Sequence, residues 1–406
     1  MKILHTADLH LGKKLGKASR LSEQCDVIRE IADISDRENV DVVLIAGDIF
    51  DASVPPSDAE RVFYRGLLTL GERGRTVIAL AGNHDDERRL CAAKPLADLQ
   101  GIVLAGELDY SGLNAAALND PVPPSSLLEV AAAADFLQKQ RVRLIGRFGG
   151  VTVEKNGERV NIALVPYPSE GRLARWTEQD YELSYADRVK KTLADACAFF
   201  TDGDYNILCT HLFLTKTETD PLGGLAALPV SVLPETADYV ALGHVHKRYQ
   251  VCKTPNAVYC GSPIQYAYDE TRAKSVTIVD TATGAVSVTP LGSGKKLTET
   301  EADNFDECMS KLDFYSADYV RLKYGGAPLG KDETLAIKSH AAFNEIVITK
   351  NFREEATTER RAHLSDGEIF DLFYKAQKGE TPSPELKAVF TGIMEELKSG
   401  GKSHAE

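Results

Sequence analysis

The segment 40–51 has the sequence VDVVLIAGDIFD, an apolar run that ends in a glycine and two aspartates. Such a run is typical of a buried β-strand, and the glycine permits a tight turn after it. Four other segments repeat this arrangement, with ligand-type side chains directly after an apolar run. The five polar motifs are DLH at 8–10, GDIFD at 47–51, GNHD at 82–85, TH at 210–211 and GHVH at 243–246.

Each polar motif follows a predicted strand. These strands are expected at 2–6, 40–46, 76–81, 206–209 and 239–242. Ligands of open α/β sheets bind in the crevice outside the carboxyl ends of the strands. We therefore expect the five strand ends to bring their polar side chains into one cleft.

The donors in these motifs are carboxylates, an amide and imidazoles, which suit Mn²⁺, Fe or Zn²⁺. Two cations about 3.5–4 Å apart can supply a nucleophile, neutralise phosphoryl charge and enforce in-line geometry in phosphodiester hydrolysis. Asp48 is predicted to bridge them, because only an anion can hold two cations so close. The other predicted ligands are Asp8, His10, Asn83, His211, His244 and His246.

Spacing divides these ligands between the two cations. Asp8 and His10 lie two residues apart on a segment predicted to be extended, so both side chains would face the same cation. His244 and His246 have the same spacing, and their loop lets each imidazole reach a different cation. Asn83 and His211 are assigned to the second site.

His84 is predicted to point away from its neighbour Asn83. That position makes it a poor ligand and a candidate general acid, with Asp85 orienting its ring. We therefore name His84 and Asp85 as the candidate catalytic residues beside the metal ligands.

A basic run follows the first motif, with no acidic residue from 9 to 22. The net charge of −13 argues against a general nucleic-acid coat protein, but a local patch and bound cations can still attract DNA. The run is either a solvated loop or a phosphate contact. Its basic residues are Lys13, Lys14, Lys17 and Arg20.

Length and composition limit the class of protein. With 406 residues the chain is expected to form two or three domains. Its seven cysteines lack zinc spacing and fit a reducing cytoplasm. No apolar run reaches the roughly 18–20 residues that span a bilayer, and Met1 leads directly into the first strand. A cytoplasmic protein with no membrane partner is therefore expected.

Strands and helices alternate in the first half, which predicts an α/β fold with partly parallel sheets. Helices are expected at 22–39 and at 57–71, the second opened by a capping box at 57–60. Further strands are expected at 143–145, 151–153, 161–165, 258–260 and 275–280, with Asn156-Gly157 as a hairpin turn. A short helix is possible at 126–140.

Three domains are predicted, at 1–270, 271–361 and 362–406. The last is expected to be a helix pair that opens with a capping box at Ser365 and continues with Ser383 as an N-cap. The second helix would carry an apolar stripe, so the pair either packs on its own chain or binds a partner. The stripe consists of Leu386, Val389, Phe390, Ile393, Met394 and Leu397.

The order of the five motifs resembles the calcineurin-like metallophosphoesterase superfamily. A closer similarity is to its bacterial DNA-repair nuclease subunits that work with a coiled-coil ATPase. The resemblance covers residues 1 to about 270, apart from 106–160. It rests on HTADLHLG at 5–12, AGDIFD at 46–51, PYPSE at 166–170, DYVALGHVH at 238–246 and YCGSP at 259–263.

This resemblance implies a four-layer α/β/β/α nuclease domain, a small α+β capping domain and a C-terminal helix pair that docks on the ATPase. It also implies Mn²⁺-dependent exonuclease and hairpin endonuclease activity in DNA repair and recombination, and a homodimer within a heterotetramer. Asp51 stands where some relatives carry a nucleotide-contacting histidine. The alternative role here is to accept a hydrogen bond from His84.

Two other functions compete with a nuclease. A phosphodiesterase for small nucleotides would use the same metal site, but it would not need two further domains. A DNA-end-binding subunit would need no hydrolysis, and a missing metal ligand would favour it. Since every expected ligand is present in the sequence, catalysis is the preferred prediction.

Overall fold

The computed structural model describes residues 1–108, 143–147, 149–176, 183–215, 227–270, 273–349, 370–371, 373–375, 381–384 and 386–390. The chain forms two compact units. The larger comprises Met1–Glu299, Leu312–Arg321 and Lys338–Glu345, and the smaller comprises Thr300–Lys311, Leu322–Ile337 and Ile346–Glu406. Within the described residues, no helix is long and apolar enough to cross a membrane.

The larger unit contains a six-stranded mixed sheet in the order β17-β16-β1-β4-β5-β6. The pairs β1–β4, β4–β5 and β5–β6 are parallel, whereas β16 runs antiparallel to both β1 and β17. The strands are β1 (Lys2–Thr6), β4 (Val42–Ile45), β5 (Thr76–Leu80), β6 (Ile102–Ala105), β16 (Lys274–Asp280) and β17 (Ala285–Leu291).

A second sheet of seven strands has the order β14-β15-β13-β10-β9-β8-β7. Its central pairs β9–β10, β10–β13 and β13–β15 are parallel. The strands are β7 (Arg143–Arg147), β8 (Gly150–Lys155), β9 (Glu158–Val165), β10 (Tyr205–His211), β13 (Tyr239–Gly243), β14 (Tyr249–Cys252) and β15 (Asn256–Tyr259).

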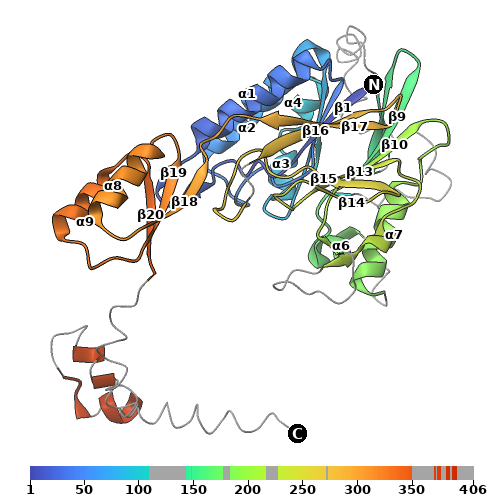
Figure 1. The fold of residues 1–406 in the computed structure, drawn as a ribbon. Helices are drawn as coiled ribbons and strands as arrows, with labels where there is room; N and C mark the ends of the chain where they lie inside the picture. The colour runs from blue at the N-terminus through green and yellow to red at the C-terminus, as the bar shows by residue number, and fades with distance from the viewer. Residues whose placement is uncertain are drawn as a thin grey trace. The chain divides into compact units, whose positions relative to one another are not determined.

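The two sheets pack face to face over a shared apolar core. Alternate residues of β1, β4 and β5, such as Ile3 and Leu44, meet Ile162 and Ile207 of the second sheet there. The outer face of the first sheet packs on α1 (Leu21–Arg37) and α2 (Ser57–Leu70), and that of the second on α6 (Glu170–Trp176) and α7 (Tyr185–Ala196) (Figure 1). The predicted α/β/β/α layering is confirmed.

Local signals in the sequence had mixed outcomes. Asn156 and Gly157 both adopt positive φ and join antiparallel β8 and β9, as the hairpin turn required. The capping box at 57–60 was wrong: Pro56 is the N-cap of α2 and no side chain caps it. Proline there has an extended ψ of 144°, so Ser57 already lies inside the helix.

The first sheet extends past residue 270, where a domain boundary was predicted, because β16 and β17 complete it on the side of β1. A separate three-stranded sheet, β18-β19-β20, follows. Its strands are Leu297–Ala302, Tyr319–Tyr324 and Phe343–Ile348, and α8 (Phe305–Phe314) and α9 (Lys331–Ser339) lie between them in sequence.

Several shorter α-helices and strands lie between these elements. They are β2 (Lys14–Leu15), β3 (Ala18–Ser19), α3 (Glu87–Cys91), α4 (Lys94–Asp98), β11 (Leu214–Thr215) and β12 (Leu228–Pro229). The seven cysteines are all free. The predicted helix at 126–140 and the capping box at Ser365 lie outside the described residues.

Near the C-terminus, the Ser383 side chain accepts a hydrogen bond from the Leu386 backbone N–H at 3.3 Å, which confirms the predicted N-cap. Phe370 and Phe390 stack with their ring centroids 4.2 Å apart. Lys387 forms an ion pair with Asp371. These two described segments therefore pack against each other through both apolar and charged contacts.

Candidate metal centre

The five polar motifs converge at the carboxyl ends of β1, β4, β5, β10 and β13. The backbone there leaves regular strand geometry: φ is 55° at Asp8, 40° at His10, 49° at Asp48 and 101° at His244. Non-glycine residues rarely adopt positive φ, and such strain is concentrated at functional sites. The prediction of an extended segment at 8–10 was therefore wrong. The side chains of Asp8 and His10 nevertheless reach the same ligand cluster.

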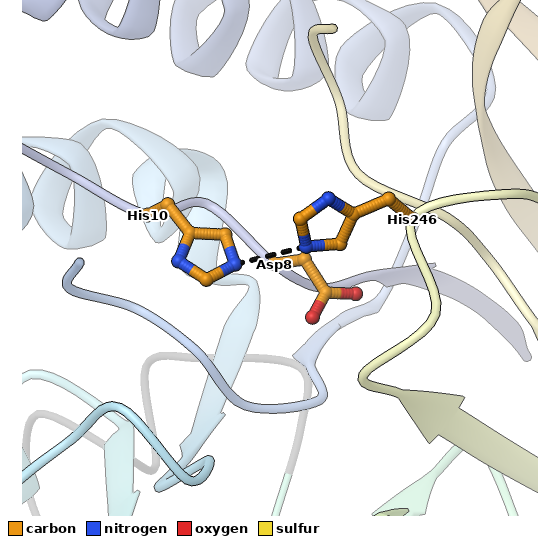
Figure 2. Close-up of side chains that lie close together, drawn as sticks. All are labelled: Asp8, His10 and His246. Carbon is orange, nitrogen blue, oxygen red and sulfur yellow. Dashed lines mark hydrogen bonds between the residues drawn. The ribbon is translucent and has the colours of Figure 1, made fainter. Parts of the chain in front are cut away.

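The first ligand cluster consists of Asp8, His10 and His246, whose ligand atoms all lie within 4.8 Å of one another. Figure 2 shows the two imidazoles facing each other above the Asp8 carboxylate. Their Nε2 atoms are 3.0 Å apart. Nitrogens bound at right angles to one cation, each at about 2.1 Å, are about 3 Å apart, so this geometry fits a shared cation.

The second ligand cluster consists of Asp48, Asn83, His211 and His244. Asn83 Oδ1 lies 3.0 Å from both His211 Nε2 and His244 Nδ1, and these two nitrogens are 3.3 Å apart. Asp48 Oδ2 lies 3.4 Å from His211 Nε2. Several lone-pair atoms at this mutual spacing fit a second cation with N/O ligands.

Asp48 lies between the two clusters. Its Oδ2 faces His10 Nε2 at 3.6 Å as well as His211, while Oδ1 accepts the His84 backbone N–H at 2.9 Å. The carboxylate is almost completely buried. A single anion with access to both clusters is the arrangement that the bridging role of Asp48 requires.

Glycines allow the two sheets to approach at this point. A Cβ on Gly243 would lie 1.8 Å from the Ala46 carbonyl oxygen, and one on Gly47 would lie 2.3 Å from His211 Nδ1. The same His211 nitrogen donates a hydrogen bond of 2.8 Å to the Ala46 carbonyl. The backbones of the two sheets therefore approach closely at the GHVH motif.

Burial and mutual attraction shift the protonation of these ligands. Burial raises the pKa of Asp8 to about 6 and lowers the pKa of His10 to about 2 and that of His244 to about 4. Burial opposes charge on Asp48 too, but His211 beside it holds the pKa of Asp48 far below its usual range. Asp48 in turn outweighs burial and raises the pKa of His211 to about 9. A bound cation would favour the deprotonated form of every ligand.

His84 brings a ligand atom within 4.8 Å of those of His10 and Asp48, so it lies closer to the ligands than predicted. The hydrogen-bond partner of its ring also differs from the prediction. Its Nδ1 donates to the backbone carbonyl of Asp51 at 2.8 Å, so Asp85 does not orient the ring. The predicted hydrogen bond between residues 51 and 84 exists, but it uses the Asp51 main chain. The Asp51 carboxylate instead contacts Lys13 at 2.6 Å.

Asp85 braces the loops that carry the ligands. Its buried carboxylate accepts three backbone N–H groups, from Ile49 at 3.1 Å, Phe50 at 2.9 Å and Gly82 at 2.8 Å. Desolvation raises the pKa of Asp85 to about 6, despite these donors. Arg172 of α6 supports the same loop by donating to the carbonyls of Gly82 and Asp85.

The basic run divides into exposed and buried residues. Lys14 and Lys17 are exposed on the β2–β3 hairpin, and Lys13 is partly buried against Asp51. Arg20 is only 1% exposed; it pairs with Glu23 and donates to the Gln265 carbonyl. The prediction that Arg20 contacts DNA was therefore wrong, because its guanidinium is buried and paired within the protein.

Sequence reasoning missed the side chains that hold the ligand loops. Gln24 donates to the His10 carbonyl at 2.7 Å, and Tyr266 packs edge-on against the rings of His10 and His246. Glu270 accepts the Nδ1 proton of His246 at 2.8 Å. The available signal was weak: Glu270 and Lys274 are oppositely charged four residues apart, shortly after the Gly-Ser-Pro sequence at 261–263.

Comparisons with known proteins agree with this site. The calcineurin-like phosphoesterase family model matches residues 1–248, which contain both ligand clusters. The chain belongs to the calcineurin-like phosphoesterase family. A Bacillus subtilis member, the SbcD component of the nuclease SbcCD, is 32% identical over 98% of this chain and 99% of its own length. The Escherichia coli K12 protein of the same name is 26% identical over 70% of this chain and 66% of its own.

Solved structures are more distant from this calcineurin-like phosphoesterase. An archaeal phosphodiesterase aligns with 72% of the chain at 16% identity and a TM-score of 0.30. A dimetal phosphatase from Danio rerio aligns with 68% at 14% identity and a TM-score of 0.36. At these TM-scores the alignments add nothing to the fold seen here.

Proposed function

We propose that this calcineurin-like phosphoesterase is the nuclease subunit of an SbcCD-type complex and hydrolyses DNA phosphodiester bonds with two divalent cations. The observation that carries the proposal is the convergence of seven N/O ligand residues into two adjacent clusters joined by Asp48. The relatives from Bacillus subtilis and Escherichia coli, both named as a component of the nuclease SbcCD, supply the substrate class. Mn²⁺ is the preferred cation, and both exonuclease and hairpin endonuclease activity are proposed.

The residues present divide the work of hydrolysis. Asp8, His10 and His246 would hold one cation and Asn83, His211 and His244 the other, with Asp48 shared. Such a cation pair supplies a deprotonated water and neutralises phosphoryl charge when bound. His84 is fixed through Nδ1 on the Asp51 carbonyl, so its Nε2 remains to donate a proton to the leaving oxygen.

DNA contact is proposed for the exposed end of the basic run. Lys14 and Lys17 project from the β2–β3 hairpin directly after the loop that carries His10. Lysines of this kind bind phosphate without reading sequence. They would give a salt-dependent affinity for the DNA backbone.

The test is Mn²⁺-dependent cleavage of duplex and hairpin DNA, with bis-p-nitrophenyl phosphate assayed in parallel. Asp48→Ala should abolish both reactions and Mn²⁺ binding, because both clusters lose a ligand. Asp33→Ala removes an exposed carboxylate on α1 and should change nothing. Full activity in Asp48→Ala would refute the two-metal assignment. Hydrolysis of the small ester without DNA cleavage would favour a small-nucleotide phosphodiesterase instead.

A coiled-coil ATPase of the SbcC type is the proposed partner, in a heterotetramer with two copies of this chain. The proposed docking element is the third predicted domain, at 362–406. Apolar side chains on its described segments are open to solvent: Phe373 is 62% exposed and Val389 is 60% exposed. Exposed apolar positions on a short helix suit a partner that supplies a groove.

This docking role predicts that partner binding can be lost without loss of phosphodiester hydrolysis. Val389→Asp should abolish co-purification with an SbcC-type ATPase while Mn²⁺-dependent hydrolysis of the small ester persists. Val288→Asp, at a 45% exposed position on β17, serves as the control. Retained co-purification with Val389→Asp and also after truncation at Ala362 would contradict the role.

A further inference from the structure

Ser262, Glu270 and Lys274 form a buried polar network that ends at His246. Glu270 places one carboxylate oxygen on each side of the network: Oε1 accepts from His246 Nδ1 at 2.8 Å, and Oε2 contacts Lys274 Nζ at 2.6 Å. Oε2 also accepts the Tyr266 backbone N–H at 3.2 Å. The carboxylate is thus held on both oxygens.

Lys274 is bonded through all three of its ammonium protons. The side chain is 6% exposed, and its Nζ reaches Glu270, the Ser262 hydroxyl at 2.7 Å and the His246 carbonyl at 3.1 Å. A buried ammonium without such partners would be costly, so this lysine has no capacity left for another ligand. Lys274 thereby links the Glu270 carboxylate to the main-chain carbonyl of His246, and Glu270 also orients the ring of His246.

The Gly-Ser-Pro sequence at 261–263 places this network beside His246. Gly261 has a φ of +80°, and a Cβ there would lie 3.0 Å from the His246 carbonyl oxygen. Ser262 donates its backbone N–H to the same carbonyl at 3.2 Å. The YCGSP motif contains none of the proposed metal ligands, and these contacts explain why it accompanies the site.

The contact fixes the chemistry of the imidazole. A carboxylate can only accept a hydrogen bond, so Nδ1 of His246 carries the proton and Nε2 presents its lone pair. That lone pair faces the first ligand cluster, 3.0 Å from His10 Nε2. In the second cluster, His211 is oriented by a main-chain carbonyl instead. His246 therefore depends on a side chain that substitution can remove.

We propose that Glu270, held by Lys274, is a positioning residue that commits Nε2 of His246 to the first ligand cluster and sets the cation affinity of that cluster alone. The proposal rests on the assignment of His246 as a ligand in the proposed function. The competing explanation is a structural ion pair that only anchors the segment to β16. The two explanations differ in what happens to the second cluster and to the histidine tautomer.

The experiment uses the full chain and the variants Glu270→Ala and Glu270→Gln. Glu345→Ala serves as the matched control, because Glu345 forms an ion pair with Arg321 and contacts neither ligand cluster. Mn²⁺ binding is titrated by the EPR signal of free Mn²⁺. In parallel, ¹⁵N NMR of the apo protein reads the tautomer of His246, assigned by the signal lost in His246→Gln.

Glu270→Ala should weaken one class of Mn²⁺ sites by about 10–100-fold and leave the other class unchanged. It should also convert His246 from the single Nδ1–H tautomer to a mixture. Glu270→Gln retains an acceptor for Nδ1 and should lose less affinity than alanine. The control should match the wild-type chain in both measurements.

Two results would overturn the proposal: unchanged affinity in both classes, or equal weakening of both classes with an unchanged tautomer. The second is the signature of a structural ion pair. Neither measurement uses a substrate, so a failed DNA-cleavage assay would refute the proposed function without deciding the role of Glu270. Conversely, a normal Glu270→Ala titration beside an inactive Asp48→Ala would refute only the positioning role.

Discussion

The two ligand clusters are built from the same kinds of side chain but are supported in different ways. The first cluster depends on side chains from distant segments: Gln24 holds the His10 main chain, and Glu270 holds the His246 ring. The imidazole of the second cluster is oriented by the main chain, since the Ala46 carbonyl holds His211 and glycines let the sheets meet, while Asp85 braces the ligand loops. Support by side chains can be tuned by single substitutions, whereas support by the main chain is part of the fold.

This difference predicts that the clusters fail separately. Substitution of Gln24 beside the first cluster should alter cation affinity with little loss of stability. Substitutions around the second should cost folding free energy as well, because the same contacts hold the two sheets together. The following changes test that separation, from the largest expected effect to the smallest.

His84→Ser should have the largest effect, and it should spare both clusters. Loss of a positioned general acid lowers turnover by about 10²–10⁴-fold, or roughly 3–5 kcal/mol in the activation barrier. Mn²⁺ stoichiometry should stay unchanged, because the Asp51 carbonyl holds Nδ1 of His84, even though a ligand atom of His84 lies within 4.8 Å of those of His10 and Asp48. Rate and metal content measured on one preparation decide the matter. A parallel fall in both would make His84 a ligand.

Asp85→Ala should produce the next largest effect, in stability. It leaves the backbone N–H groups of Ile49, Phe50 and Gly82 without their acceptor, and each buried unpaired donor costs about 1–3 kcal/mol. We expect a loss of about 3 kcal/mol in the free energy of unfolding, measured by urea denaturation. Asp33→Ala on α1 is the control. A loss below about 0.5 kcal/mol would show that Asp85 is not a brace.

Gly243→Ala should disturb the second cluster through packing. The new methyl group would lie 1.8 Å from the Ala46 carbonyl oxygen, and such overpacking costs about 1–3 kcal/mol. The hydrogen bond from His211 to that carbonyl should weaken, and so should one class of Mn²⁺ sites. Gly171→Ala is the control, since no atom outside its own stretch of helix lies within 4 Å of its Cβ position. An equal loss in both variants would argue against tight sheet contact.

The ligand set was predictable because each ligand directly follows a strand, and strand ends fix where side chains emerge. Asp8 and His10 show the limit of that reasoning: they meet through left-handed backbone rather than by strand alternation. Likewise, the partner of His84 is a main-chain carbonyl, which cannot be predicted from residue type because every residue has one. The sequence identifies the ligand side chains, but the loop conformation decides which atoms they contact.

Arg20 and Glu270 were unpredictable for a related reason. A basic residue after a metal loop has the same appearance in sequence whether it faces solvent or a buried acid such as Glu23. Glu270 lies 24 residues after His246, and only the fold of the Gly-Ser-Pro segment brings them together. The His246–Glu270 contact depends on the fold of distant segments. The Arg20–Glu23 pair is local, but the burial of Arg20 against the Gln265 carbonyl also depends on the fold.

Gln24→Ala should have the smallest effect and should touch the first cluster alone. The change removes the 2.7 Å hydrogen bond to the His10 carbonyl and the 3.1 Å contact with the Gly12 N–H. A neutral hydrogen bond contributes about 1 kcal/mol, which corresponds to roughly a fivefold loss in affinity for one class of Mn²⁺ sites. Gln24→Glu keeps the acceptor for Gly12 but not the donor to His10, so it isolates the loss of the hydrogen bond to the His10 carbonyl. If the affinity loss appeared in both classes equally, the two clusters would share their support after all.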